Sequence, residues 1–220
     1  MCEILIKTFD KLEFANDFLK KGAMLFSQAS HFKDLDVNDA RGDNTEGHVI
    51  EPFTINITEN IKRIFIGDGK GKQYVLDWEA VKRDYPELND NIGKVGFKTE
   101  YIANVLIYSI TCVNSTMENI DDILKECSKF GDYSVVIYDV KDFVDKIKKL
   151  PIRQAGLVKY SDEGNKDIFV KPTKYKNEQE FRIMLNNDNN EDKKIYNIGK
   201  IKAFIWNSRK LSTIIPMMLN

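Results

Sequence analysis

The sequence lacks an excess of either charge. Its 220 residues include 33 lysines and arginines and 34 aspartates and glutamates, for a net charge of −1. A protein held to nucleic acid by its overall field carries a strong positive charge. The balance therefore argues against that class, although it leaves room for a local basic patch.

Cysteine and histidine are scarce. The three cysteines, Cys2, Cys112 and Cys127, form no Cys-x-x-Cys pair, and their odd number argues against a disulfide framework. With only His31 and His48 as imidazole donors, a zinc site would need an unusual ligand set. We therefore expect no metal site and a chain that resides in a reducing compartment.

Long apolar runs are also missing. No stretch of about 18 continuous apolar residues occurs, and no signal peptide opens the chain. We expect a soluble, cytoplasmic protein without a membrane partner. The glycine-rich segment 67–71 lacks the G-x-x-x-x-G-K-[ST] spacing of a phosphate-binding loop, so it predicts a turn between two strands.

Strand-like runs outnumber helical ones in the remaining sequence. Strands are expected at 3–9, 23–27, 49–58, 61–66, 73–76, 101–113, 133–138, 155–160 and 195–205. Helices are expected after Asp10 and up to Gly22, from Asn119 to about 130, and over 140–150 behind an Asp139 cap. The pattern predicts a single α+β domain, 1–220, with a mixed, mostly antiparallel sheet, a few flanking helices and a peripheral excursion at 77–98. Its predicted core includes Val105, Ile107, Val135, Val136, Phe181 and Ile183.

The late stretch 169–185 carries the densest chemistry. In an extended strand the side chains alternate between two faces, so Glu178, Glu180 and Arg182 share one face. Phe181 and Ile183 lie on the other, which can pack on a core. The charged face is either a solvated strand surface or an active-site strand with one acid as the working group.

A second charged cluster lies in a long polar segment early in the chain. Between residues 40 and 47 it contains Arg41, Asp43 and Glu46 and two glycines that permit tight turns. Long ordered loops in compact domains are often functional. We expect this cluster to lie near Glu178–Arg182, either as part of one site or as a clamp that holds the loop.

Several motifs together resemble a group of bacterial and phage-associated proteins. The segment LEFANDFLKKGAMLFSQASHFKDL is followed by ARGDNTEG, and Phe-Gly-Asp at 130–132 precedes the buried run YSVVIY. The late stretch supplies the matching positions Lys171, Tyr175, Glu178, Glu180, Phe181 and Arg182. This resemblance covers most of the chain and implies no particular activity.

A more distant resemblance is to ADP-ribosyltransferases. Glu178-Gln179-Glu180 is similar to their late Glu/Gln-x-Glu motif, whose second glutamate is the catalytic acid. The resemblance implies a split, mostly antiparallel α+β fold around an NAD cleft. Two departures stand out. The Ser-Thr-Ser of the middle strand has only an early echo at 27–30, and Lys7 occupies the neighbourhood of the expected first-strand arginine or histidine.

The resemblance gives each candidate residue an expected role. Glu180 would stabilise the positive charge that develops on the ribose carbon as nicotinamide leaves, and Glu178 would position the acceptor. The expected cofactor is NAD, and its candidate binding residues are Arg41, Ser27, Arg182 and Tyr175. A guanidinium pairs bidentately with phosphate, which makes Arg41 or Arg182 a candidate for the pyrophosphate.

These expectations describe an ADP-ribosyltransferase-like effector of a phage-defence or toxin system, acting on a macromolecular acceptor that is protein or nucleic acid. Alternatives stay open. Arg182 can instead pair with a glutamate on its own strand, and Tyr175 can serve core packing. The chain can also be a non-enzymatic protein that binds a host or phage protein. A nuclease site built from Asp43, Glu46, Glu180 and Lys171 would have a metal-binding composition but no connecting motif.

Overall fold

The structure is a computed structural model that describes residues 2–33, 48–56, 63–67, 73–84, 94–162 and 167–219. The chain forms two compact units. One comprises Met1–Val49 together with Tyr101–Asn220, and the other comprises Ile50–Glu100. The excursion expected at 77–98 lies inside the second unit, which begins much earlier, at Ile50.

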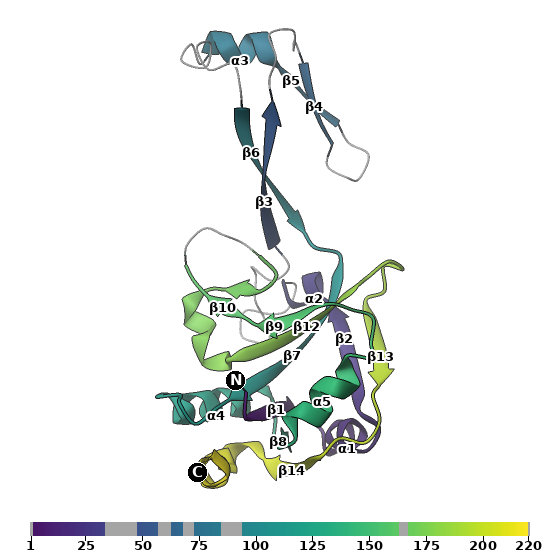
Figure 1. Cartoon of the computed structure of the whole chain (residues 1–220), viewed down its shortest axis with the longest axis vertical. Coiled ribbons are helices and arrows are strands. Elements are labelled where there is room, and N and C mark those ends of the chain that lie inside the picture. The colour runs from purple at the N-terminus through teal and green to yellow at the C-terminus, as the bar shows by residue number, and fades with distance from the viewer. Residues whose placement is uncertain are drawn as a thin grey trace. The chain divides into compact units, whose positions relative to one another are not determined.

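The larger unit is built on an eight-stranded sheet whose strand pairs are antiparallel (Figure 1). Its main path runs β13-β2-β7-β1-β8-β14, and β12 pairs with both β7 and β9. The strands are β1 (Ile4–Phe9), β2 (Ala23–Gln28), β7 (Val105–Val113), β8 (Tyr133–Ile137), β9 (Ile152–Leu157), β12 (Glu180–Asn186), β13 (Lys193–Asn197) and β14 (Ala203–Asn207). This confirms the predicted α+β fold with a mostly antiparallel sheet.

Short helices and a small sheet complete this unit. The helices are α1 (Leu12–Lys21), α2 (Ala29–Lys33), α4 (Ile120–Cys127), α5 (Val140–Ile147) and α6 (Ile215–Leu219). Short 3₁₀ helices are η2 (Ser128–Phe130), η3 (Thr173–Glu178) and η4 (Ser208–Thr213). Strand β10 (Lys159–Tyr160) pairs in parallel with β11 (Val170–Lys171).

Local capping signals explain where two of these helices begin and end. Gly22 closes α1 with φ 65°, the left-handed conformation that glycine adopts most readily. The Asp139 carboxylate accepts a hydrogen bond of 3.0 Å from the Asp142 amide and caps α5 as predicted. The predicted Asp10 cap is wrong, because Lys11 occupies the N-cap position of α1 and makes no side-chain cap.

Strand β7 is the centre of the sheet. The predicted strand 101–113 is interrupted at residues 103 and 104, so that β7 begins at Val105. One edge of β7 pairs with β12 from Val105 to Thr111. The other edge is divided between two strands: β2 pairs near its start, with Ser27 opposite Ile107, and β1 pairs near its end, with Ile6 opposite Thr111. The two strands diverge between these points and form a fork beside residues 108–110.

The two faces of the sheet are covered differently. Helices α1 and α5 cover one face over a continuous apolar cluster that includes Phe18, Met24, Phe26, Tyr108, Phe143 and Ile183. The opposite face carries two separate apolar clusters, one under α4 and α6 and one around Ile107 and Met184. Between them lie Ser109, Glu180 and Arg182, all polar. Of the predicted core residues, Val105, Ile107, Val135, Val136 and Ile183 are buried, and Phe181 is half-buried.

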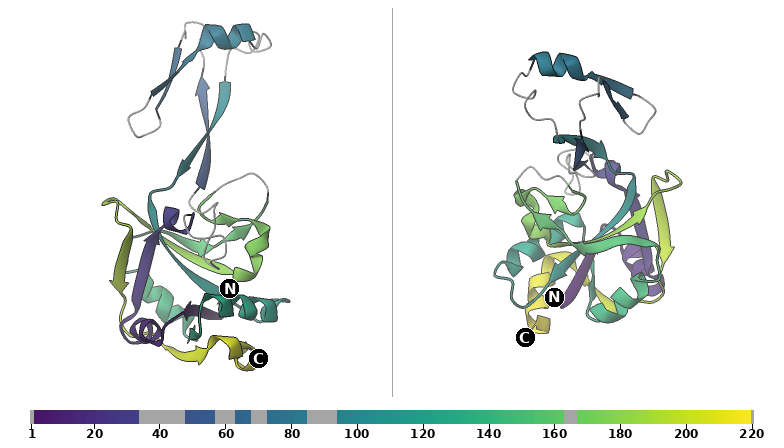
Figure 2. Two further views of the ribbon diagram at one scale, coloured as in Figure 1. Left: turned by 180° about the vertical axis from the view of Figure 1, so that it is seen from behind. Right: turned by 45° about the horizontal axis from the view of Figure 1, so that its top comes forward.

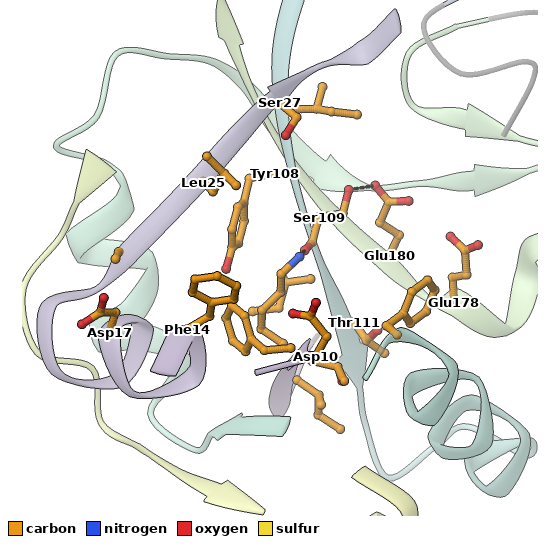
Figure 3. A pocket seen from close by; sticks show the side chains of 18 of the residues that line it. Asp10, Phe14, Asp17, Leu25, Ser27, Tyr108, Ser109, Thr111, Glu178 and Glu180 are labelled. Carbon is orange, nitrogen blue, oxygen red and sulfur yellow. Dashed lines mark hydrogen bonds between the residues drawn. The ribbon is translucent and has the colours of Figure 1, made fainter. Parts of the chain in front are cut away.

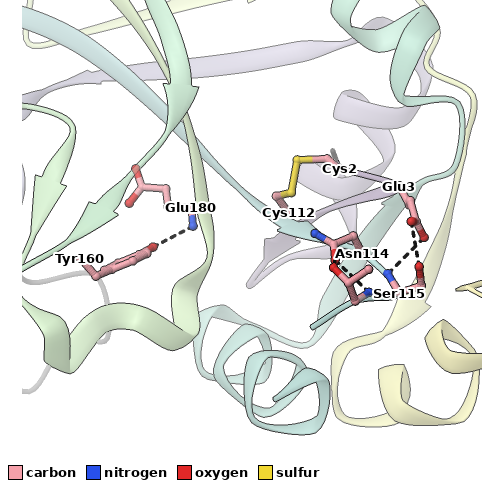
Figure 4. Close-up of a disulfide and its surroundings, with 8 residues drawn as sticks. Cys2, Glu3, Cys112, Asn114, Ser115, Tyr160 and Glu180 are labelled. Carbon is pink, nitrogen blue, oxygen red and sulfur yellow. Dashed lines mark hydrogen bonds between the residues drawn. A yellow bond between two sulfur atoms is a disulfide. The ribbon is translucent and has the colours of Figure 1, made fainter. Parts of the chain in front are cut away.

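Cys2 and Cys112 form a disulfide across a sequence separation of 110 residues (Figure 4). The odd number of cysteines, which argued against a disulfide framework, therefore did not exclude this one disulfide. The spacing of the cysteines in the sequence did not reveal the pair, because Cys2 and Cys112 come together only when the end of β7 pairs with the start of β1. Disulfides persist in oxidising surroundings, which is at odds with the expected reducing compartment. Cys127 is free, and burial raises the pKa of its thiol to about 11.

The second unit contains the hairpin predicted around residues 67–71. Strand β4 (Arg63–Gly67) pairs antiparallel with β5 (Gln73–Asp77), and α3 (Trp78–Asp84) follows directly (Figure 2). The Asp77 carboxylate accepts from the amides of the first turn of α3 at 3.0 and 3.3 Å, which explains why the helix begins there. Strands β3 (His48–Asn56) and β6 (Lys94–Ile102) form a further two-stranded sheet. Over the described ranges of the chain, no helix combines the length and the apolar character needed to cross a membrane.

Candidate functional site

A cavity of about 490 Å³ occupies the fork between β1 and β2 (Figure 3). Its walls come from β1, β2, β7, the first turns of α1 and the segment that leads into β12. Pockets for small molecules commonly measure about 300–1,000 Å³ and combine apolar walls with a few convergent polar groups. The residues on these walls fit that description: Phe9, Phe14, Leu25, Tyr108 and Ile110 on the apolar side, and Lys7, Ser27, Ser109, Lys171, Glu178 and Glu180 on the polar side.

The fork leaves part of the β7 backbone without a neighbouring strand, and Lys7 fills the gap. Its ammonium group donates a hydrogen bond of 2.7 Å to the backbone carbonyl of Ser109. The same ammonium lies 4.5 Å from the centre of the Tyr108 ring, within the range of a cation–π contact. A positive charge is thereby held at the cavity wall on the first strand, where the resemblance expected an arginine or histidine.

Glu180 is the most deeply buried carboxylate of the cavity, with 4 % of its surface exposed. The guanidinium of Arg182 donates two hydrogen bonds to it from one side, from Nε to Oε1 at 2.6 Å and from Nη2 to Oε2 at 3.0 Å. The ammonium of Lys171 lies 3.1 Å from Oε2, and the Ser109 hydroxyl donates to Oε1. The carboxylate is therefore held in one orientation from three sides.

These contacts decide the protonation state of Glu180. Burial by itself raises the pKa of a carboxyl group, because it penalises the charged form. Here the charges of Arg182 and Lys171, with hydrogen bonds from Arg182 and Ser109, outweigh burial and hold the pKa of Glu180 well below its ordinary value. Glu180 is consequently ionised at neutral pH.

Lys171 joins the two glutamates of the Glu-Gln-Glu motif. Its ammonium lies 2.7 Å from Oε2 of Glu178 and 3.1 Å from Oε2 of Glu180. The side chains of Lys171 and Glu178 are only 10 % and 11 % exposed, so water screens these pairs weakly. The sequence included Lys171 only as a motif position and as a possible nuclease residue, and its role as a shared counter-ion was not predicted.

The predicted arrangement of the late strand is right for two charged residues and wrong for the third. Glu180 and Arg182 share a face of β12. Glu178 is not on that strand, because it ends η3 and Gln179 turns the chain with φ 44° before β12 begins. The interpretation of a solvated face is also wrong, since Arg182 is 1 % exposed.

Arg182 adopts the pairing role that was the alternative to phosphate binding. Besides the two bonds to Glu180, its Nη1 donates to the backbone carbonyl of Ile168. Arg182 does not line the cavity. The contacts of Arg182 with Glu180 and Ile168 direct its guanidinium into the protein, which argues against the expected role at a pyrophosphate.

Tyr160 completes the environment of Glu180. Its hydroxyl accepts a hydrogen bond of 2.9 Å from the backbone amide of Glu180 (Figure 4). Burial and the nearby charge of Glu180 raise the pKa of Tyr160. The first residue of β12 is therefore fixed through both its backbone and its side chain.

The remaining candidate residues are divided by the structure. Ser27 lines the cavity, as the cofactor-binding expectation requires. Tyr175 is half-buried outside the cavity lining, and the ammonium groups of Lys171 and Lys174 lie 5.2 and 4.6 Å from its ring centre. Arg41, with Asp43 and Glu46, lies outside the described residues, so its expected proximity to Glu180 stays a prediction.

Tyr108 and Ser109 are cavity residues that sequence reasoning missed. Both lie within β7, which reads as an uninterrupted buried strand. A serine and a tyrosine at consecutive positions of such a run were the available signal, because hydroxyls in a core need partners. The signal does not say which partners, since Glu180 is 71 residues away from Ser109 in the sequence.

Among the described residues, no group of three or more His, Cys, Asp or Glu side chains is arranged to hold a metal ion. Comparisons of the chain with protein-family models, with curated proteins and with solved structures find no match. The geometry of the cavity is therefore the basis for the functional argument.

Proposed function

We propose that the protein is an ADP-ribosyltransferase-like enzyme that binds NAD in the cavity and uses Glu180 as its essential carboxylate. The observation that carries this proposal is the state of Glu180, an ionised carboxylate held from three sides at the wall of a cavity of small-molecule size. The Glu-Gln-Glu spacing singled out the same residue from the sequence alone.

The reaction requires a fixed negative charge at one place. The bond between the nicotinamide nitrogen and the ribose carbon breaks, and its electron pair leaves with nicotinamide. A nucleophile of the acceptor forms a new bond to that carbon and releases its proton. Because positive charge develops on the ribose carbon between these events, an immobile carboxylate stabilises the transition state more than the ground state.

Lys171 is the counter-ion that can release one side of Glu180 when the ribose binds. In the structure the charge of Glu180 is already compensated by Lys171 and Arg182. Lys171 also contacts Glu178, so its ammonium can remain paired with Glu178 while the ribose takes over the Oε2 side of Glu180. The second carboxylate of the motif then acts as the place to which the counter-ion withdraws.

The other polar wall of the cavity suits the phosphates. Lys7 contributes a positive charge from β1, and Ser27 contributes a hydroxyl from β2. A lysine binds phosphate as a point charge and needs no bidentate geometry. These residues take the role that Arg182 cannot fill while it holds Glu180.

One observation favours a second candidate function. The two glutamates are matched by two cations within the cluster, and a closed set of ion pairs can serve structure alone. In that case the chain is a non-enzymatic protein that binds a host or phage protein. The setting in a phage-defence or toxin system, and a protein or nucleic acid as the acceptor, rest on the sequence resemblances.

The test is to incubate the purified protein with NAD and a cell extract and to search for modified protein or nucleic acid by mass spectrometry. We expect modification by the wild type and a rate at least about a hundredfold lower for Glu180→Gln, which keeps the shape and removes the charge. The affinity for NAD, measured by calorimetry, should differ far less between Glu180→Gln and the wild type.

The matched control is Glu126→Gln. Glu126 lies on α4, pairs with Lys129 and does not line the cavity. Glu126→Gln should leave the rate unchanged. Equal modification by the wild type and Glu180→Gln would remove the role of Glu180. Absence of both NAD binding and modified product would leave the interaction protein as the better description.

A further inference from the structure

Tyr108 presents an unsatisfied polar group at the cavity. In the part of the chain that the structure describes, its hydroxyl is the one buried side-chain nitrogen or oxygen without a hydrogen-bond partner. Tyr108 lines the cavity and is 4 % exposed. Buried hydroxyls in folded proteins nearly always have a partner, so an unpaired one asks for an explanation.

The Tyr108 ring is fixed in place and cannot turn to find a partner. Its centre lies 5.5 Å from the ring centre of Phe26 and 6.1 Å from that of Phe18, in the continuous core beneath α1. The Lys7 ammonium lies over the same ring at 4.5 Å. Packing therefore determines where the hydroxyl points, and the partner has to come to it.

The surroundings of this hydroxyl indicate the kind of partner. The cavity lining includes the aromatic side chains of Phe9 and Phe14 and the aliphatic side chains of Leu25 and Ile110, together with the carboxylates of Asp10 and Asp17. Aromatic walls favour planar ligands that stack on them. A phenolic hydroxyl at the end of such a wall selects a ring that carries a hydrogen-bond acceptor.

We infer that this part of the cavity is a separate subsite, in which the Tyr108 hydroxyl hydrogen-bonds to an acceptor on a bound planar heteroaromatic ring. The subsite lies across the fork from Glu180, and its ligand chemistry is shared by a purine base and by an aromatic carboxamide. The inference concerns binding and holds whether or not ADP-ribose is transferred.

The hydroxyl is shielded from solvent, so a ligand has to displace a side chain to reach it. Phe14 is suited to this movement. It lies in the first turn of α1, is 46 % exposed and lines the cavity. In Figure 3 the hydroxyl end of Tyr108 points toward Phe14. A ring that replaces Phe14 beside Tyr108 exchanges one aromatic contact for another and adds a hydrogen bond.

Tyr108→Phe separates a ligand-binding hydroxyl from a structural one. A structural hydroxyl lowers stability when it is removed, whereas an unpaired buried hydroxyl does not. We expect Tyr108→Phe to melt at the same temperature as the wild type or higher, and to bind ring-bearing ligands roughly tenfold more weakly, as the loss of one hydrogen bond implies.

The experiment measures binding of four probes to the wild type and to Tyr108→Phe by calorimetry. NAD, AMP and nicotinamide mononucleotide carry a heteroaromatic ring, and ribose 5-phosphate carries the sugar and phosphate without one. We expect Tyr108→Phe to weaken NAD and one of the two mononucleotides, which identifies the ring. Binding of ribose 5-phosphate should be the same in both proteins.

The outcomes separate this inference from the proposed enzymatic function. Equal NAD affinity in both proteins overturns the subsite and leaves NAD binding intact. Tyr108-dependent binding of AMP or nicotinamide mononucleotide without NAD binding supports the subsite and overturns the NAD proposal. Binding of none of the ring ligands to the wild type overturns both.

Tyr196→Phe is the matched control. Tyr196 is half-buried on β13, packs against Phe26 and does not line this cavity. Its hydroxyl loss should leave the affinity for every probe unchanged. A tenfold loss of affinity in Tyr196→Phe as well would show that the effect comes from the core and would overturn the assignment to Tyr108.

Discussion

Two tyrosines of the larger unit have hydroxyl groups in opposite situations, Tyr108 at the wall of the cavity and Tyr160 beside the backbone of Glu180. The Tyr160 hydroxyl accepts from the backbone of Glu180, next to a carboxylate that is bound by Arg182 and Lys171. Tyr160 is half-buried, whereas the Tyr108 hydroxyl is fully buried and has no hydrogen-bond partner among the described residues. Each is a phenol in a protein interior, yet only one of them belongs to a closed network.

The difference separates stability from binding capacity. A satisfied polar network in a core holds its members in one geometry, and breaking any part of it leaves the others exposed to the full desolvation penalty. An unsatisfied hydroxyl destabilises the empty protein. A ligand that supplies the missing hydrogen-bond partner removes this penalty, so the hydroxyl favours the complex. We therefore expect mutations of the groups that hold Glu180 to act mainly on the free energy of unfolding, and mutations at Tyr108 to act mainly on ligand binding.

The largest effect is expected for Arg182→Met. The substitution removes the bidentate partner of Glu180 and leaves a buried carboxylate with less compensation. Breaking a buried pair in this way typically costs about 3–5 kcal/mol in the free energy of unfolding. Urea unfolding followed by circular dichroism measures this loss.

Two further variants test the explanation for Arg182. Arg153→Met, at an exposed position of β9, should change the free energy of unfolding by no more than about 0.5 kcal/mol. The double variant Arg182→Met/Glu180→Leu replaces the pair by apolar groups and should recover most of the loss. A loss below about 1 kcal/mol for Arg182→Met would show that Glu180 does not depend on it.

The next effect is a loss of stability in acid. The folded-state pKa of Glu180 lies well below its unfolded value, so its contribution is complete above an unfolded pKa of about 4.3 and declines as the pH falls toward the folded pKa. Between pH 6 and pH 3 this amounts to about 2 kcal/mol for one such group. Unfolding curves at a series of pH values should show this decline in the wild type.

Glu180→Gln provides the comparison, since an amide does not titrate. The difference in unfolding free energy between the wild type and Glu180→Gln should narrow as the pH falls from 6 to 3. Parallel pH profiles for the two proteins would mean that Glu180 has the same pKa in both states, contrary to the geometry around it.

A smaller loss is expected for Tyr160→Phe. The substitution leaves the buried amide of Glu180 without its acceptor, which typically costs about 1–2 kcal/mol. Thermal unfolding should register it as a lower midpoint, with NAD affinity nearly unchanged. An unchanged midpoint would show that the hydroxyl of Tyr160 contributes as little to stability as that of Tyr108, contrary to the proposed difference between them.

The smallest effect on folding is expected for Tyr108→Phe. Removal of an unpaired hydroxyl should change the free energy of unfolding by less than about 1 kcal/mol, in the stabilising direction. Measured beside Tyr160→Phe under the same conditions, the two variants should shift the midpoint in opposite directions. A destabilised Tyr108→Phe would reveal a partner inside the protein.

Local signals let the sequence predict much of this architecture. Gly22 ends a helix and Asp139 begins one because each acts through backbone groups a few residues away. The alternation in β12 correctly placed Glu180 and Arg182 on one face. The prediction of Asp10 as the N-cap of α1 was wrong, because Lys11 stands between Asp10 and the helix. Residue type alone does not decide which position becomes the N-cap.

The environment of the site was beyond the sequence because it is assembled from distant strands. The alternation in β12 is the same for a solvated face and a buried one. The partners of Glu180 decide between them: Ser109 reaches it through the pairing of β7 with β12, and Lys171 reaches it because η3 folds β11 back toward the start of β12. The pairing of Cys2 with Cys112 escaped prediction for the same reason.

The position of β7 also has a consequence for how the chain acquires its structure. Strands β1 and β2 are synthesised first, but β7, the strand with which both of them pair, follows only after the whole of the second unit, Ile50–Glu100. Closing the longer loop adds little to the equilibrium, because loop entropy grows only logarithmically with length. Its effect is on rate, since native contacts between remote segments form slowly. A nascent chain that ends before Val105 lacks the strand with which both β1 and β2 pair, so the sheet begins to form only when β7 has been synthesised.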